Sequence, residues 1–136
     1  MVLLAAGLNI HSFRLIWHVG TRYYELDQPT VMDYKEKILN ELGAKSQYQR
    51  FAIRSDLTHS WEHSLLGVRF DLEIFSVWLL EGFFYLLSET IRHLIGQVTQ
   101  ILVIGSWLRF DIINGLNLTH LLTRNWVEMQ AASGAP

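Results

Sequence analysis

The sequence predicts an all-α protein: several helices with a long hydrophobic helical region that is membrane-embedded or buried in an assembly. Three observations support this fold class. Residues 71–109 carry apolar side chains on every side of a helical wheel, and such a helix is buried in protein or lipid. Only 18% of the residues are charged, below the roughly 25% of soluble domains. No stretch shows the strict alternation of a half-buried strand.

The chain of 136 residues is expected to form one domain with four parts. These are an apolar, basic N-terminal helix over 1–26, an amphipathic helical region over 27–70, the hydrophobic helical region with a possible short membrane span over 71–113, and a polar C-terminal tail over 114–136. The net charge of −2 gives a nucleic-acid partner no electrostatic support. The lack of cysteine excludes a disulfide framework and a thiolate zinc site.

The N-terminal part is basic and poor in acid. Arg14 and Arg22 lie among apolar residues, and no acidic residue precedes Glu25. This composition is typical of a mitochondrial targeting segment, and it fits an ordinary first helix equally well.

The second part begins with the clearest helix. Pro29 marks its boundary because proline disfavours helix at the residue before it, and Thr30 with Asp33 resembles a capping box. An amphipathic, water-facing helix is therefore predicted over 30–42. Gly43 provides a left-handed stop. Further helical pieces are expected over 44–54 and 57–66.

The third part contains a candidate membrane span. Its charge-free core, Leu94–Leu108, covers roughly 22 Å, short of the ~30 Å hydrocarbon layer. Arg92 and Arg109 flank it and can extend it by reaching the headgroups, while Trp107 suits the membrane boundary. A short span supported by neighbouring helices and full burial in a large assembly both fit.

Polar groups cross this apolar region at helical spacing. If 71–109 is one helix, Glu81, Ser88 and Arg92 lie near one face, and Glu89 reaches Arg92 three residues on. Buried charges need partners. The four residues are predicted to form a partner-binding seam, and internal ion pairing is the simpler explanation.

The segment EGFFYLLSETIRHLIGQVTQILVIGSWLR resembles the central region of the optic atrophy 3-like family of mitochondrial proteins. The likeness rests on Gly82, the Leu87-Ser88-Glu89 triplet, the glycine-bearing run 96–105, and Trp107 with Arg109. Upstream, Arg22, Pro29 and Lys35 match the family's order of basic and proline residues.

This resemblance implies a small helical protein of the mitochondrial inner membrane with no chemistry of its own. We therefore expect a non-enzymatic accessory subunit of ATP synthase or a respiratory-chain complex, acting in assembly, scaffolding and lipid contact. Its expected partners are other subunits and membrane lipids. No cofactor, small-molecule substrate or nucleic acid is expected.

A zinc-dependent hydrolase is the rival function. Residues 59–63 spell His-x-x-Glu-His, in which His59 and His63 would bind zinc and Glu62 would activate water. Chance matches to so short a pattern are common, so no metal site is assigned. Haem is a further possibility at three scattered histidines, His18, His93 and His120. Asn117 starts a glycosylation pattern.

Overall fold

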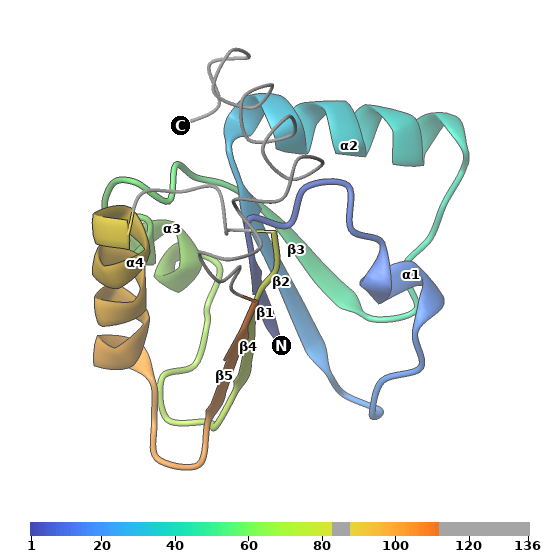
Figure 1. Cartoon of the computed structure of the whole chain (residues 1–136). Helices are drawn as coiled ribbons and strands as arrows, with labels where there is room; N and C mark the ends of the chain where they lie inside the picture. Colours follow the sequence, from blue (N-terminus) through green and yellow to red (C-terminus); the bar gives the residue numbers. More distant parts are fainter. Residues whose placement is uncertain (83–87, 112–136) are drawn as a thin grey trace, which may run out of the picture.

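The computed structural model describes residues 1–82 and 88–111 (Figure 1). Strands and helices alternate along the chain. In order they are β1 (Val2–Leu4), α1 (His11–Arg14), β2 (Arg22–Asp27), α2 (Pro29–Glu41), β3 (Gln49–Arg54), α3 (Glu62–Gly67), β4 (Val77–Leu80), α4 (Ser88–Ile101) and β5 (Trp107–Phe110).

The five strands of the described residues form one parallel sheet in the order β3-β2-β1-β4-β5. β1 lies at its centre, and its residues Val2, Leu3 and Leu4 are at most 1% exposed. Parallel strands are covered on both faces, so they read as unbroken apolar runs rather than as alternating ones. This explains why the stretch beginning at Val2 forms a strand without a strand-like pattern.

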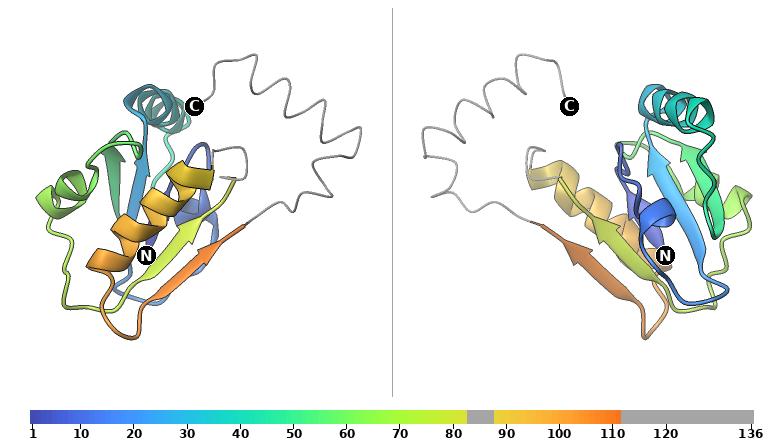
Figure 2. Two further views of the ribbon diagram at one scale, coloured as in Figure 1. Left: turned by 60° about the vertical axis from the view of Figure 1, so that its left-hand side comes forward. Right: turned by 90° about the vertical axis from the view of Figure 1, so that its right-hand side faces the viewer.

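Helices cover both faces of the sheet (Figures 1 and 2). On one face, under α1 and α2, lies a small core of Leu3, Ala6, Tyr23, Met32 and Leu79. The other face, under α3 and α4, carries the larger core. Its buried members are Val2, Leu4, Tyr24, Leu26, Ile53, Leu57, Trp61, Leu65, Trp78, Leu80, Leu94 and Val98.

A row of aromatic rings crosses this larger core. Phe51 stacks on Tyr24 at 4.7 Å, and Tyr24 meets Phe70 edge-on at 5.2 Å between ring centroids. Trp78 then contacts Phe70 at 5.6 Å and Trp61 at 6.0 Å, both edge-on. Edge-to-face pairs are the favoured geometry for aromatic rings. Trp61 and Trp78 therefore fill the protein core.

The structure confirms the amphipathic helix predicted over 30–42, as α2. Its N-cap is Gln28 with Pro29 in the first turn, and its side chain makes no capping hydrogen bond, so the predicted Thr30–Asp33 capping box is wrong. Gly43 follows with φ +61°, as expected for a left-handed stop. The buried residues of the helix are Met32 and Lys35, and Lys35 is buried because a carboxylate lies beneath it.

The predicted all-α fold is wrong. The N-terminal part contains β1, α1 and β2, residues 49–54 form β3, and the hydrophobic region divides into β4, α4 and β5. Its all-round apolar character comes from strands and a helix in a two-sided α/β sandwich, not from one embedded helix. Within residues 1–82 and 88–111, every helix is too short or too polar to cross a bilayer.

Candidate functional site

The order of the strands makes the carboxyl end of β1 a topological switch point, the place where an open α/β sheet forms a ligand crevice. From β1 the chain builds outward through β2 and β3, then returns to the other side of β1 to add β4 and β5. α1 and α4, which follow the neighbouring strands β1 and β4, therefore pack on opposite faces of the sheet (Figure 2). In open α/β sheets, ligands bind at the carboxyl ends of the strands at such a switch point.

The loop after β1 turns sharply at this crevice. Ala5 and Gly7 adopt φ values of +50° and +47°, a region in which glycine is free of strain and other residues are not. The backbone amide of Ala6 donates to the carbonyl oxygen of Leu26 at 3.0 Å. The loop is thereby fastened to the end of β2.

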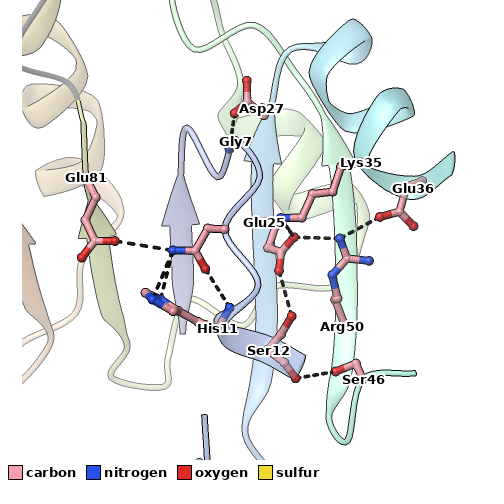
Figure 3. Close-up of polar contacts among 11 residues, drawn as sticks. Gly7, His11, Ser12, Glu25, Asp27, Lys35, Glu36, Ser46, Arg50 and Glu81 are labelled. Carbon is pink, nitrogen blue, oxygen red and sulfur yellow. Dashed lines mark hydrogen bonds and ion pairs between the residues drawn. The ribbon is translucent and has the colours of Figure 1, made fainter. Parts of the chain in front are cut away.

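Asp27, the last residue of β2, receives two backbone hydrogen bonds, and Figure 3 draws the one from Gly7. Its Oδ2 accepts from the Gly7 amide at 2.6 Å, and its Oδ1 accepts from the Gln28 amide at 2.7 Å. Each carboxylate oxygen can accept a further hydrogen bond. The side chain is half-buried, so this fixed carboxylate is available to a ligand that presents hydroxyl groups.

Glu81, the first residue after β4, lies level with Asp27 on the other side of β1. The register shows this, because Leu4 pairs with both Leu26 and Leu80. The carboxylate of Glu81 is exposed. Its Oε2 accepts from Nδ2 of Asn9, in the loop after β1, at 3.5 Å. The two carboxylates therefore flank the end of the central strand.

The Asn9 side chain also contacts His11, the first residue of α1. Asn9 Oδ1 accepts from the His11 backbone amide at 2.8 Å, while Asn9 Nδ2 lies 3.1 Å from Nδ1 of the imidazole. Figure 3 shows Glu81 and His11 converging from β4 and α1. Asn9 thus connects the two functional groups across the crevice.

The outer strands also end in carboxylates. Asp111 follows β5 and accepts from the Gly82 amide at 3.0 and 3.1 Å, which anchors the start of the segment after β4. Asp56 follows β3, and hydrogen bonds from the side chain and the backbone of Thr58 hold its pKa below the ordinary value. This concentration of carboxylate side chains at the carboxyl ends of the strands favours a ligand that carries positive charge.

A buried ion cluster lies beneath the site on the α1/α2 face. Glu25 Oε2 contacts Lys35 Nζ at 2.6 Å and Arg50 Nη2 at 2.7 Å, and Arg50 also contacts Glu36 Oε1 at 2.7 Å. Ser12 of α1 donates to Glu25 Oε1 at 2.9 Å (Figure 3). The cluster joins α1, α2 and β3 to β2, two residues before Asp27.

Glu25 is fully buried and remains ionised through its partners. Burial alone would raise its pKa, but the hydrogen bonds and positive charges of Arg50 and Lys35 outweigh burial and hold the pKa below the ordinary value. The two acids and two bases of the cluster balance in charge. Removing one member would leave another buried charge without its partner, which is strongly destabilising.

A hollow of about 800 Å³ lies at the opposite end of the strands, beside their amino ends. Its walls include Trp17, Tyr24, Phe70, Phe75 and Val77, near the amino ends of β2 and β4. Apolar side chains dominate its walls, and the carboxylates of Asp27 and Glu81 lie at the carboxyl ends of the strands. The hollow is therefore separate from the crevice.

The residues predicted as a partner-binding seam do not lie on one helix. Glu81 follows β4, whereas Ser88 begins α4, on which Glu89 and Arg92 form an exposed ion pair at 2.9 Å. Whether the four residues meet a partner stays a prediction.

The residues predicted at a membrane boundary are Arg92 on α4 and Trp107 and Arg109 on β5. β5 is an edge strand of the described sheet, and the Trp107 side chain is 73% exposed. The described residues therefore contain no membrane-spanning helix that ends at Arg109.

The hypothesis of a zinc site at residues 59–63 is also wrong. His59 precedes α3 and contacts Asp56 at 3.2 Å, while Glu62 and His63 open the helix. Among residues 1–82 and 88–111, no group of three or more histidine or acidic side chains is placed to hold a metal ion. His18 and His93 are exposed, and two further residues of interest, Asn117 and His120, lie outside the described residues.

Sequence reasoning missed Asn9, Glu25, Asp27 and Arg50, and placed Lys35 on a solvated face. One signal for Asp27 was present. An apolar run ends in Gly7, and an acidic residue follows 20 positions later, the spacing of nucleotide-binding βαβ units. The charges of the ion cluster are distant in sequence, so no local pattern pairs them.

Comparison with known proteins identifies a family. A family model described as leucine carboxyl methyltransferase matches residues 1–99. A protein of Mycobacterium avium named as an S-adenosyl-L-methionine-dependent methyltransferase is 42% identical over 106 residues, which are 77% of this chain and 34% of that protein. A similarly named protein of Mycobacterium bovis is 36% identical over 135 residues, 98% of this chain and 43% of its own length.

A third similarly named relative, from Mycobacteroides abscessus, is 39% identical over 116 residues, 85% of this chain and 38% of its own length. The chain thus spans less than half the length of these relatives. The matches overturn the resemblance to the optic atrophy 3-like family. They also overturn the expectation of a non-enzymatic accessory subunit of ATP synthase or a respiratory-chain complex, and the rival zinc-hydrolase hypothesis. The expectation of membrane-complex partners without a small-molecule substrate is wrong as well. The chain belongs to the leucine carboxyl methyltransferase family.

Proposed function

We propose that this chain binds S-adenosyl-L-methionine (AdoMet) at the crevice and forms the cofactor-binding part of a methyltransferase. Family membership supports the choice of ligand. The observation that carries the proposal is the carboxylate of Asp27, fixed by the Gly7 amide at the carboxyl ends of the central strands. AdoMet combines an adenosine, a sulfonium cation and an amino-acid end, and each can be compared with the residues present.

The ribose fits Asp27. An acidic side chain about 20 residues after the glycine loop accepts hydrogen bonds from ribose hydroxyls in dinucleotide-binding folds. Asp27 has this spacing from Gly7, and both of its oxygens are already oriented by backbone amides. The carboxylate therefore needs no reorganisation before it accepts a hydroxyl.

The positive charge of AdoMet fits Glu81. Its exposed carboxylate flanks β1 opposite Asp27. AdoMet supplies a methyl group that a lone pair of the acceptor takes while the carbon–sulfur bond breaks and its electrons remain on sulfur. The family description names a carboxyl group as the acceptor. An ionised carboxylate needs orientation rather than a base, so this chain's contribution is to hold the cofactor in place.

Calorimetric titration of the 136-residue chain with AdoMet and with S-adenosylhomocysteine (AdoHcy) tests the proposal. We expect both to bind, and Asp27→Asn to weaken both at least tenfold, because a hydrogen bond to a charged acceptor contributes about 1.5–3 kcal/mol. Asp71→Asn, at the wall of the opposite hollow, is the matched control and should bind like the wild type. Absence of binding by the wild-type chain, or equal effects of the two substitutions, would contradict the proposal.

A further inference from the structure

The orientation of the Asn9 side-chain amide is determined by the backbone. Its oxygen must face the His11 backbone amide, because that N–H donates to Oδ1 at 2.8 Å. The nitrogen, Nδ2, therefore faces the imidazole of His11 and the carboxylate of Glu81, at 3.1 and 3.5 Å. An amide nitrogen donates hydrogen bonds and does not accept them.

This orientation selects one form of the imidazole. A ring nitrogen that faces the Asn9 donor must accept, and Nδ1 is nearer than Nε2, which lies 3.4 Å from the same atom. The neutral ring therefore carries its hydrogen on Nε2. His11, which is half-buried at the start of α1, thus presents an N–H donor, and Asn9 Nδ2 contacts both its ring and Glu81 Oε2.

A donor and an anionic acceptor that contact one Asn9 amide match the two charged groups of an α-amino acid. The amino-acid end of AdoMet carries an ammonium and a carboxylate on one carbon atom. Glu81 complements the ammonium, which leaves the carboxylate to a nearby donor. We propose that His11, oriented by Asn9, binds the carboxylate of this amino-acid end. The inference rests on the proposed function and assigns the part of the ligand that Asp27 does not reach.

A purely structural role for His11 makes a different prediction. If Asn9 and His11 served only to shape the loop after β1, their loss would disturb the whole crevice, including Asp27. Every ligand containing the nucleoside would then lose affinity equally. A ligand without the amino-acid end separates the two roles.

The experiment compares AdoHcy with 5′-methylthioadenosine, which keeps the nucleoside and the sulfur and lacks the amino acid. We expect His11→Leu to weaken AdoHcy about tenfold, the size of one lost charge-assisted hydrogen bond, and to leave methylthioadenosine within twofold. His11→Gln, which keeps an N–H donor, should retain most of the affinity for AdoHcy. His18→Leu, an exposed histidine at the opposite edge, is the control.

Retained binding of methylthioadenosine shows that a variant is folded. Equal loss of both ligands in His11→Leu, or unchanged affinity for AdoHcy, would overturn the inference while the proposed function stands. A wild-type chain that binds neither ligand would overturn the proposed function itself.

Discussion

The backbone amide of Gly7 donates a 2.6 Å hydrogen bond to the side-chain carboxylate of Asp27. This contact fastens the loop after β1 to the end of β2, and it orients the carboxylate before any ligand arrives. A backbone donor in a left-handed turn and an acid 20 residues later are thus one unit. The proposed cofactor site is built around it.

The first prediction concerns the left-handed turn at Gly7. Space is available for a methyl group, whose nearest neighbour is the Ala5 carbonyl oxygen at 4.0 Å, but φ is +47°. Gly7→Ala should therefore destabilise the chain by about 1–2 kcal/mol through backbone strain alone. Urea unfolding measures this. Gly96→Ala, within α4 with open space around it, should instead stabilise by about 0.5–1 kcal/mol. Equal effects of the two would refute the left-handed turn.

Removing the central acid of the ion cluster should be costly. Glu25→Gln leaves Lys35 and Arg50 without their buried counter-charge, and such losses cost about 3–5 kcal/mol. Glu89→Gln breaks the exposed pair with Arg92 and should cost under about 1 kcal/mol. Chemical unfolding of both variants tests the contrast. A Glu25→Gln variant as stable as Glu89→Gln would mean that the cluster is not a structural anchor.

The cluster also predicts acid sensitivity. The pKa of Glu25 in the folded chain lies below its ordinary value of 4.5, so the folded state binds fewer protons than the unfolded state. The stability due to this ionisation is fully present above about pH 5 and is lost as pH falls through the folded pKa. Urea midpoints at pH 7, 5, 4 and 3 should show the stability gap between wild type and Glu25→Gln narrowing in acid. A gap that stays constant would contradict this.

The segment that suggested a zinc motif should contribute to stability through Trp61. Its indole Nε1 donates to Gln97 Oε1 of α4 at 3.0 Å, and Gln97 Nε2 donates to the His59 carbonyl at 3.4 Å. Trp61→Phe and Gln97→Ala should each destabilise by about 1 kcal/mol or more. In a double-mutant cycle their effects should couple by about 0.5–1 kcal/mol. Strict additivity would show that the indole does not depend on Gln97.

The sequence predicted α2 well because its helix signals are local. Pro29 and Gly43 bound the helix as expected, whereas its buried face was misjudged. Lys35 is 2% exposed because it meets Glu25, and that pairing across ten residues of chain leaves no trace in a hydrophobic pattern. Charge on a helix indicates a solvated face only when no buried partner exists elsewhere.

The hydrophobic region was misread for a different physical reason. Strands covered on both faces and a packed helix are both apolar throughout, so periodicity does not separate them. β4 and β5 flank α4 within this region, and breaks at Gly82 and Gly105, both at positive φ, mark where it divides. Of the proposed site, the spacing of Gly7 and Asp27 was readable from the sequence. The meeting of Asn9, His11 and Glu81 depends on the strand order and was not.

The most direct test of the central claim is a ¹⁵N–¹H spectrum of the 136-residue chain titrated with AdoHcy. The amides of Gly7 and Gln28, which donate to the Asp27 carboxylate, and of Gly82 should shift most. The amides of Gly20 and Thr21, at the opposite hollow, should stay in place. Shifts concentrated at Gly20 and Thr21, or none at saturating AdoHcy, would contradict a cofactor site at the carboxyl ends of the strands.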